Sequence, residues 1–180
     1  MLVPPGPPLL SGCAGHSPPP DARHTALIAP YRLDSGDTLR VIVFGQADLT
    51  NTYAVDQSGA ISMPLIGIVP VRGRTVAEVE GAVAAKLRAG YLRQPDVSVE
   101  VDRYRPFFAM GEVGAAGQYS YVTGMTVQSA VAIAGGFTPR ADKSTVKVTR
   151  NANGYVETLT LNLSDPVRPG DTLYVRERLF

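Results

Sequence analysis

The chain has 180 residues, 44% hydrophobic and 18% charged, and this is long enough for one compact domain or two small ones. Its 17 Lys and Arg residues nearly balance its 16 Asp and Glu residues, so the net charge of +1 gives no basis for a nucleic-acid surface or a polybasic membrane patch. The single cysteine, Cys13, excludes an internal disulfide and any multi-cysteine metal site in the monomer. The only histidines are His16 and His24, so we predict no histidine-dependent catalytic site and no cofactor.

Residues 1–30 contain eight of the 15 prolines and are interpreted as a signal and lipobox remnant followed by a proline-rich tether. Leu10-Ser11-Gly12-Cys13 resembles a bacterial lipobox, which predicts lipidation of Cys13; the alternative is an ordinary thiol in an extended tail. MLVPPGPPLL has no Lys or Arg and four prolines, unlike a secretory leader. Either the true start lies upstream, or Cys13 is not processed. Ala14, where many inner-membrane lipoproteins have Asp, implies the outer membrane.

The folded part begins at Tyr31 with a turn that recurs near the end of the chain. A turn signal, Ser35-Gly36-Asp37, precedes an apolar strand over 38–44, and Val167 to Val175, VRPGDTLYV, repeats this pattern. Gly36 and Gly170 are expected to supply a positive φ, and each following aspartate to accept a backbone N–H. Asp37 and Asp171 could also be viewed as a catalytic carboxylate pair, but turn capping explains both residues.

A hairpin is predicted over 53–63, with its turn at Asp56-Gln57-Ser58-Gly59, and a further apolar strand over 65–71. A helix then starts at Thr75, which forms a capping box with Glu78, and ends at Gly90. The alternation over 95–104 predicts a strand with one solvent-exposed side.

Arg103-Tyr104-Arg105-Pro106 is expected to join two modules. After it we predict buried strand 107–110, a glycine-rich bend, strand 118–122, and a helix capped by Thr126 and ended by Gly135-Gly136. A hairpin is expected over 143–163 before the last strand. The fold class is therefore α+β, with two small mixed β-sheet modules that each carry one helix and with the second module a β-grasp. The predicted domains are 1–30, 31–105 and 106–180.

The order GEVGAAGQYSY, GMTVQSAVAIAGGFT, KVTR and VRPGDTLYV resembles the soluble-ligand-binding β-grasp (SLBB) module of bacterial polysaccharide export proteins. Upstream, YRLDSGDTLRVIVFGQADL, VDQSGAISMPLIGIVPVRGRTVAEVE and QPDVSVEV are similar to the amino-terminal export domain of the same family. The two resemblances together account for nearly everything after Tyr31. The chain resembles the short class of this family, which lacks a carboxy-terminal pore helix.

The resemblance implies a lipid-anchored outer-membrane protein, facing the periplasm, in an exopolysaccharide or capsule export machine. It would form a homo-oligomeric ring that conducts the polysaccharide passively, beside an inner-membrane copolymerase or tyrosine kinase and an outer-membrane β-barrel. The alternatives are a soluble saccharide-binding module and a scaffold that links the copolymerase to the barrel. No enzymatic activity is predicted, since no nucleotide-binding fingerprint or nucleophile–base spacing occurs. Candidate sugar or intersubunit contacts are Arg103, Tyr104, Arg105, Tyr119 and Tyr121.

Overall fold

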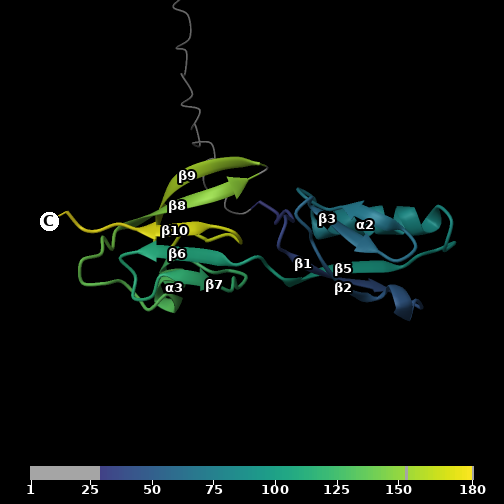
Figure 1. Ribbon diagram of the computed structural model, residues 1–180, viewed down its shortest axis with the longest axis horizontal. Helices are drawn as coiled ribbons and strands as arrows, with labels where there is room; N and C mark the ends of the chain where they lie inside the picture. Colours follow the sequence, from purple (N-terminus) through teal and green to yellow (C-terminus); the bar gives the residue numbers. More distant parts are fainter. Residues whose placement is uncertain (1–28, 153, 180) are drawn as a thin grey trace, which may run out of the picture.

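The computed structural model describes residues 29–152 and 154–179, which form two lobes arranged along the long axis of the molecule (Figure 1). These ranges contain two α-helices and ten strands, so the predicted α+β fold is confirmed. No helix within them has the length and apolar character needed to cross a bilayer.

The first lobe is built on a three-stranded antiparallel sheet in the order β2-β1-β5, with a separate two-stranded sheet of β3 and β4. A 3-10 turn, η1 (Ala47–Leu49), connects β1 to β2. The elements are β1 (Thr38–Val43), β2 (Asn51–Ala54), β3 (Ala60–Met63), β4 (Gly67–Pro70), α2 (Val76–Arg88) and β5 (Val97–Arg103). One continuous core, which includes Leu39, Val41, Ile61, Val69, Val83 and Val99, lies between the sheets and α2.

Helix α2 begins as the sequence predicts. The Thr75 side chain accepts a hydrogen bond from the Glu78 N–H, and the Glu78 carboxylate accepts one from the Thr75 N–H, so the capping box is complete. Its buried face of Val79, Val83 and Leu87 has helical spacing and faces the first core.

The predicted hairpin over 53–63 is wrong. The turn around Asp56 exists, because the Asp56 N–H donates to the carbonyl of Ala60 and the Gly59 N–H to that of Asp56. The strands on its two sides nevertheless diverge into different sheets, since β2 pairs with β1 while β3 pairs with β4. Each strand thus pairs with its neighbour on the other side in the sequence, β2 with β1 and β3 with β4, instead of with the other.

The second lobe is one five-stranded sheet in the order β7-β6-β10-β8-β9. Its central strands β6 and β10 run parallel, whereas the other neighbours are antiparallel. The elements are β6 (Phe107–Gly111), β7 (Gly117–Tyr119), α3 (Val127–Ile133), β8 (Thr145–Ala152), β9 (Tyr155–Asn162) and β10 (Thr172–Val175). Helix α3 buries Val127, Ala130 and Val131 in a core with Phe107, Val148 and Leu173, residues that lie on one face of the sheet.

Local signals in the second lobe are largely confirmed. Thr126 caps α3, and Ser129 completes a second capping box that the sequence reading missed. Gly135 and Gly136 have φ values of 84° and 80° at the end of the helix, as predicted. The hairpin of β8 and β9 is present, whereas the strand predicted over 118–122 is the shorter β7.

Candidate functional site

The repeated Gly-Asp-Thr-Leu turn places one buried aspartate in each lobe, immediately before β1 and before β10. Asp37 accepts the Asp34 N–H at 2.9 Å, and Asp171 accepts the Arg168 N–H at 2.8 Å. Gly36 and Gly170 have φ values of 92° and 83°. The prediction that both aspartates cap their turns is confirmed, and both carboxylates are occupied by donors.

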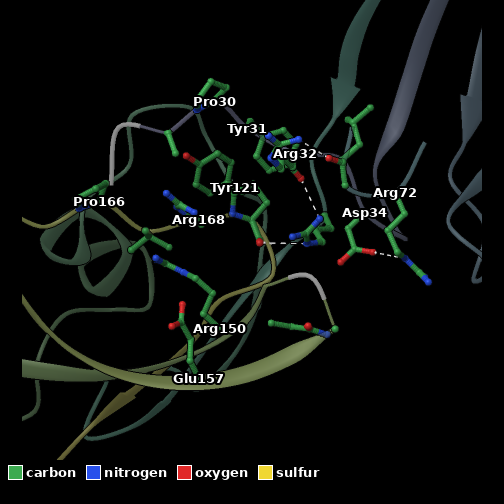
Figure 2. A pocket seen from close by; sticks show the side chains of 18 of the residues that line it. Pro30, Tyr31, Arg32, Asp34, Arg72, Tyr121, Arg150, Glu157, Pro166 and Arg168 are labelled. Atoms are coloured by element: carbon green, nitrogen blue, oxygen red, sulfur yellow. Dashed lines mark hydrogen bonds and ion pairs between the residues drawn. The ribbon is translucent and has the colours of Figure 1, made fainter. Parts of the chain in front are cut away.

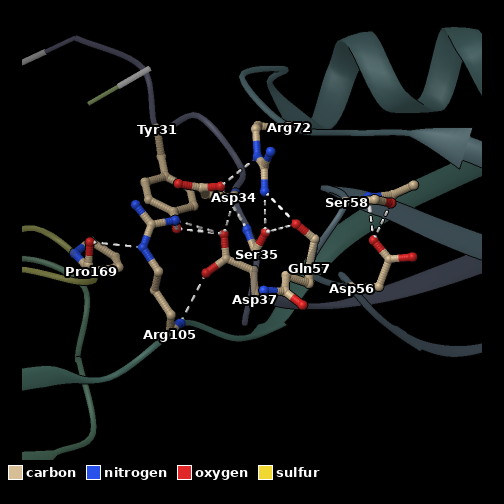
Figure 3. Close-up of polar contacts among 11 residues, drawn as sticks. Tyr31, Asp34, Ser35, Asp37, Asp56, Gln57, Ser58, Arg72, Arg105 and Pro169 are labelled. Carbon is tan, nitrogen blue, oxygen red and sulfur yellow. Dashed lines mark hydrogen bonds and ion pairs between the residues drawn. The ribbon is translucent and has the colours of Figure 1, made fainter. Parts of the chain in front are cut away.

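Arg105 connects the two turns, as Figure 3 shows. Its backbone N–H donates to Asp37 Oδ1 at 2.9 Å, and its Nη1 donates to Asp37 Oδ2 at 3.3 Å and to the Tyr31 hydroxyl at 3.1 Å. On the other side, Arg105 Nε donates to the Pro169 carbonyl at 3.1 Å, and the Gly170 N–H donates to the Pro106 carbonyl at 3.1 Å. Arg105 therefore holds the turn of one lobe against that of the other.

Gly170 lets this contact form, because a Cβ at that position would lie 2.5 Å from Arg105 Nε. Tyr31 completes the network by donating from its hydroxyl to Asp37 at 2.6 Å. Burial and this hydrogen bond raise the pKa of the Tyr31 hydroxyl well above its ordinary value, so Tyr31 stays a neutral donor at neutral pH.

In the second lobe Asp171 is paired with Arg150, which projects from β8. Arg150 Nε and Nη2 donate to the two carboxylate oxygens at 2.8 and 2.7 Å, and both side chains are buried. This bidentate geometry is the one in which an arginine–carboxylate pair is strongest. Arg150 thus binds the buried aspartate of the second turn, as Arg105 binds that of the first. Unlike Arg105, it makes no contact with the other lobe through this pair, because Arg150 and Asp171 both belong to the second lobe.

Three tyrosines continue the connection between the lobes. The Tyr31 and Tyr104 rings pack edge-to-face with centroids 5.1 Å apart, and the Tyr104 and Tyr121 rings do the same at 5.4 Å. Tyr121 follows β7, so this aromatic row starts in the first lobe and ends in the second. Burial raises the pKa of the Tyr121 hydroxyl above its ordinary value.

A cleft of about 720 Å³ lies between the lobes beside this row. Figure 2 shows Tyr121, Arg150 and Arg168 on the side of the second lobe, and Arg32 and Arg72 toward the first. Five arginines line the cleft, whereas its only lining carboxylates among the described residues are Asp34 and Glu157. Such a surface is chemically suited to hold a polar ligand with negative charge. The described residues contain no group of three His, Cys, Asp or Glu side chains that could hold a metal ion.

Only two of the five contact residues predicted from the sequence line the cleft. Arg105 and Tyr121 line the cleft, and Tyr104 packs against Tyr121 behind it. Arg103 is exposed at the end of β5, outside the cleft lining. Tyr119 stacks on Phe107 at 5.7 Å and donates to the Ala115 carbonyl at 2.5 Å, so it supports the second core. Cys13 lies outside the described residues.

Sequence reasoning missed Arg150 and Arg168. A signal for Arg168 was present, since aligning Asp34-Ser35-Gly36-Asp37 with Arg168-Pro169-Gly170-Asp171 replaces an acidic side chain by a basic one at the first position. Arg150 had no local signal, because a single arginine in an alternating strand also fits a solvent-exposed position.

The fold and the cleft together define a two-lobed α+β protein in which a basic, tyrosine-lined cleft separates two small β-sheet units. Two family models match it in succession: polysaccharide biosynthesis/export protein over residues 26–102 and SLBB domain over residues 110–159. The SLBB match covers the β6 to β9 region and agrees with the β-grasp predicted for the second lobe.

The names of two curated relatives also refer to exopolysaccharide production or export. The chain is 36% identical over 124 residues to the exopolysaccharide production protein ExoF of Rhizobium meliloti, covering 62% of this chain and 29% of that protein. It is 28% identical over 175 residues to the EPS I polysaccharide export outer membrane protein EpsA of Ralstonia solanacearum, covering 82% of this chain and 46% of that protein. The chain thus spans less than half the length of these relatives. It belongs to the polysaccharide export protein family.

Proposed function

We propose that this protein is a component of an exopolysaccharide or capsule export machine at the periplasmic face of the outer membrane. The observation that carries the proposal is the succession of a polysaccharide export domain and an SLBB domain in one chain. The names of its relatives support the same role, because EpsA is named an outer membrane export protein. Its domains are 31–105 and 106–180, and it acts on the polymer by passage rather than by catalysis.

The working form in this proposal is a ring of identical copies whose lumen passes the polysaccharide. A closed ring needs a building block of fixed shape, since every contact must repeat the same rotation. The Arg105 network and the tyrosine row support this, because both cross from one lobe to the other. A second support is the sheet face opposite α3, where Phe108, Met110 and Tyr174 are exposed. Register places Tyr174 beside Met110, so these side chains form an apolar surface suited to self-association.

Electron microscopy and sedimentation of the purified full-length protein test the ring directly. Closed rings are expected, and the Met110→Lys variant should dissociate them because it places a charge in the apolar surface. Val122→Lys is the matched control, since Val122 is exposed in the loop before α3 and away from that surface. A protein that stays monomeric at high concentration beside its envelope partners contradicts the ring.

The role itself is tested in the source bacterium. Deletion of the gene should abolish secretion of the polymer, and a plasmid copy should restore it; normal secretion without the protein refutes the role. A lipid anchor at Cys13 is part of the proposal, so fatty-acid labelling of the chain with its native upstream sequence should disappear in Cys13→Ser. We place an inner-membrane copolymerase or tyrosine kinase and an outer-membrane β-barrel beside the ring, and crosslinking in cells tests both partners.

A second candidate is a saccharide-binding module that acts without forming a conduit. The inter-lobe cleft favours it, since that cleft combines arginine and tyrosine side chains in a volume typical of small-ligand sites. Oligosaccharide binding by a stable monomer is the result expected for this candidate and not for the ring.

A further inference from the structure

The cleft between the lobes contains one arginine that forms no ion pair with a described residue. Of its five lining arginines, four form ion pairs: Arg32 with Glu78 at 3.7 Å, Arg72 with Asp34 at 3.0 Å, Arg105 with Asp37 at 3.3 Å and Arg150 with Asp171 at 2.7 Å. Arg168 forms no ion pair with any described residue. Arg168 is therefore the one lining arginine without a carboxylate in ion-pair contact, and the nearby Glu157 attracts it only at longer range.

The surroundings of Arg168 are unfavourable for a charged guanidinium. Its Nη2 atom is buried and has no hydrogen-bond acceptor within the described part of the chain. Burial, and then the nearby positive charge of Arg150, lower the pKa of the Arg168 guanidinium from its ordinary value, against the weaker opposing attraction of Asp171 and Glu157. A buried donor without a partner is rare in folded proteins and is unfavourable. The Arg168 side chain as a whole is only half-buried and lines the cleft, so an anion that contacts its accessible part would offset the cost of burying its charge.

Tyr121 supplies a flat ring close to Arg168 in the same cleft (Figure 2). The Tyr104 and Tyr121 rings pack edge-to-face, which restricts the orientation of Tyr121. Glu157 also lines the cleft and forms no ion pair with a described residue. Its carboxylate accepts hydrogen bonds and repels a compact polyanion, so the cleft favours a ligand with hydroxyl donors and only one negative group in each sugar unit.

We propose that Arg168 and Tyr121 form a subsite for a carboxylate-bearing sugar, such as a uronic acid residue of an acidic oligosaccharide. Arg168 holds the carboxylate, Tyr121 contacts a face of the sugar ring, and Glu157 accepts from its hydroxyls. This proposal rests on the proposed function only for the view that the sugar belongs to an exported polymer. Binding is weak and reversible, which a moving chain requires.

A titration of the full-length chain followed by NMR tests the subsite. The probe is a hexamer of galacturonic acid, and maltohexaose is the uncharged counterpart. The acidic hexamer should shift the amide signals of Tyr121, Arg150 and Arg168, whereas maltohexaose should bind at least about tenfold more weakly. Arg168→Gln should weaken binding of the acidic hexamer by about tenfold, and Arg168→Lys by less, because lysine keeps the charge but not the bidentate geometry.

Two controls make a loss of binding interpretable. Arg93→Gln removes an exposed arginine outside the cleft and should leave the affinity unchanged. Arg168→Gln should keep its fold, since the turn uses only the backbone N–H of this residue, and the spectrum of the free variant verifies this.

Several results overturn the proposal. These are no shift in the cleft at about 10 mM hexamer, equal binding of maltohexaose, and unchanged affinity in Arg168→Gln. Complete competition by inorganic phosphate at equal concentration would show a simple anion site, and NOEs between residues 1–28 and Tyr121 would show that the chain itself fills the cleft. The proposed function fails separately: if deletion of the gene stops secretion while the hexamer does not bind, the export role stands and this subsite does not.

Discussion

The two buried aspartates invite a quantitative comparison, because the same turn relies on a different arginine in each lobe. Asp37 accepts four side-chain hydrogen bonds, and only one of them, at 3.3 Å, comes from the Arg105 guanidinium. Asp171 accepts three, and two of them come from Arg150 at 2.7 and 2.8 Å. After loss of its arginine, Asp37 keeps three donors whereas Asp171 keeps one.

We therefore expect Arg150→Met to destabilise the protein more than Arg105→Met. Arg150→Met leaves an uncompensated charge on Asp171, which is completely buried, at a cost of about 3–5 kcal/mol. Arg105→Met removes one long hydrogen bond from Asp37 and the bonds to Tyr31 and Pro169, a loss of about 2–3 kcal/mol. Methionine keeps most of the aliphatic packing in both variants.

Urea unfolding followed by far-UV circular dichroism measures both losses, since the chain has no tryptophan for fluorescence. Adding Asp171→Asn to Arg150→Met should restore part of the stability, because it removes the stranded charge. Equal losses in the two single variants, or a larger loss in Arg105→Met, would refute the reasoning that the remaining donors set the cost.

Three further predictions concern single side chains. The pKa of Glu78 is lowered, first by the hydrogen bond from the Thr75 N–H, so its contribution to stability is present above its unfolded pKa and is lost as the pH falls through the folded value. The stability difference between wild type and Glu78→Gln should accordingly shrink between about pH 7 and pH 3, and a constant difference in urea unfolding would contradict this. The raised pKa of Tyr31 has the opposite sign: its contribution is present below its unfolded pKa and is lost as the pH rises above it, so Tyr31→Phe should flatten the loss of stability above about pH 10. Leu65 is exposed with a φ of 67°, so Leu65→Gly should raise the free energy of unfolding by about 0.5–1 kcal/mol, and a decrease would mean that its side chain packs.

Sequence patterns predicted the parts of the fold that depend on near neighbours. Both helices start at threonine caps, because a cap needs only residues three positions apart. The β8–β9 hairpin is also local. The hairpin over 53–63 was wrong because strand pairing there is decided by β1 and β4, and alternation says nothing about which partner a strand takes.

Less of the candidate site than of the fold could be predicted from the sequence. Arg105 and Tyr121 were selected as candidate contacts, and both line the cleft, but the ion pair of Arg150 with Asp171 joins residues 21 positions apart on strands whose register was unknown. That Arg168 differs from the other four lining arginines depends on those four forming ion pairs, which is a property of the folded arrangement alone.

The repeated turn explains why its first position accepts side chains of opposite charge in the two lobes. In both lobes the first residue of the turn contributes its backbone N–H to the buried aspartate, so the side chain at that position is not needed for the turn. In the first lobe this side chain is Asp34, which forms an ion pair with Arg72, so its charge is compensated within that lobe. In the second it is Arg168, which stays open to the cleft. Arg168→Asp should therefore still form the turn, which the amide spectrum of the free variant verifies, while reversing the charge offered to a ligand.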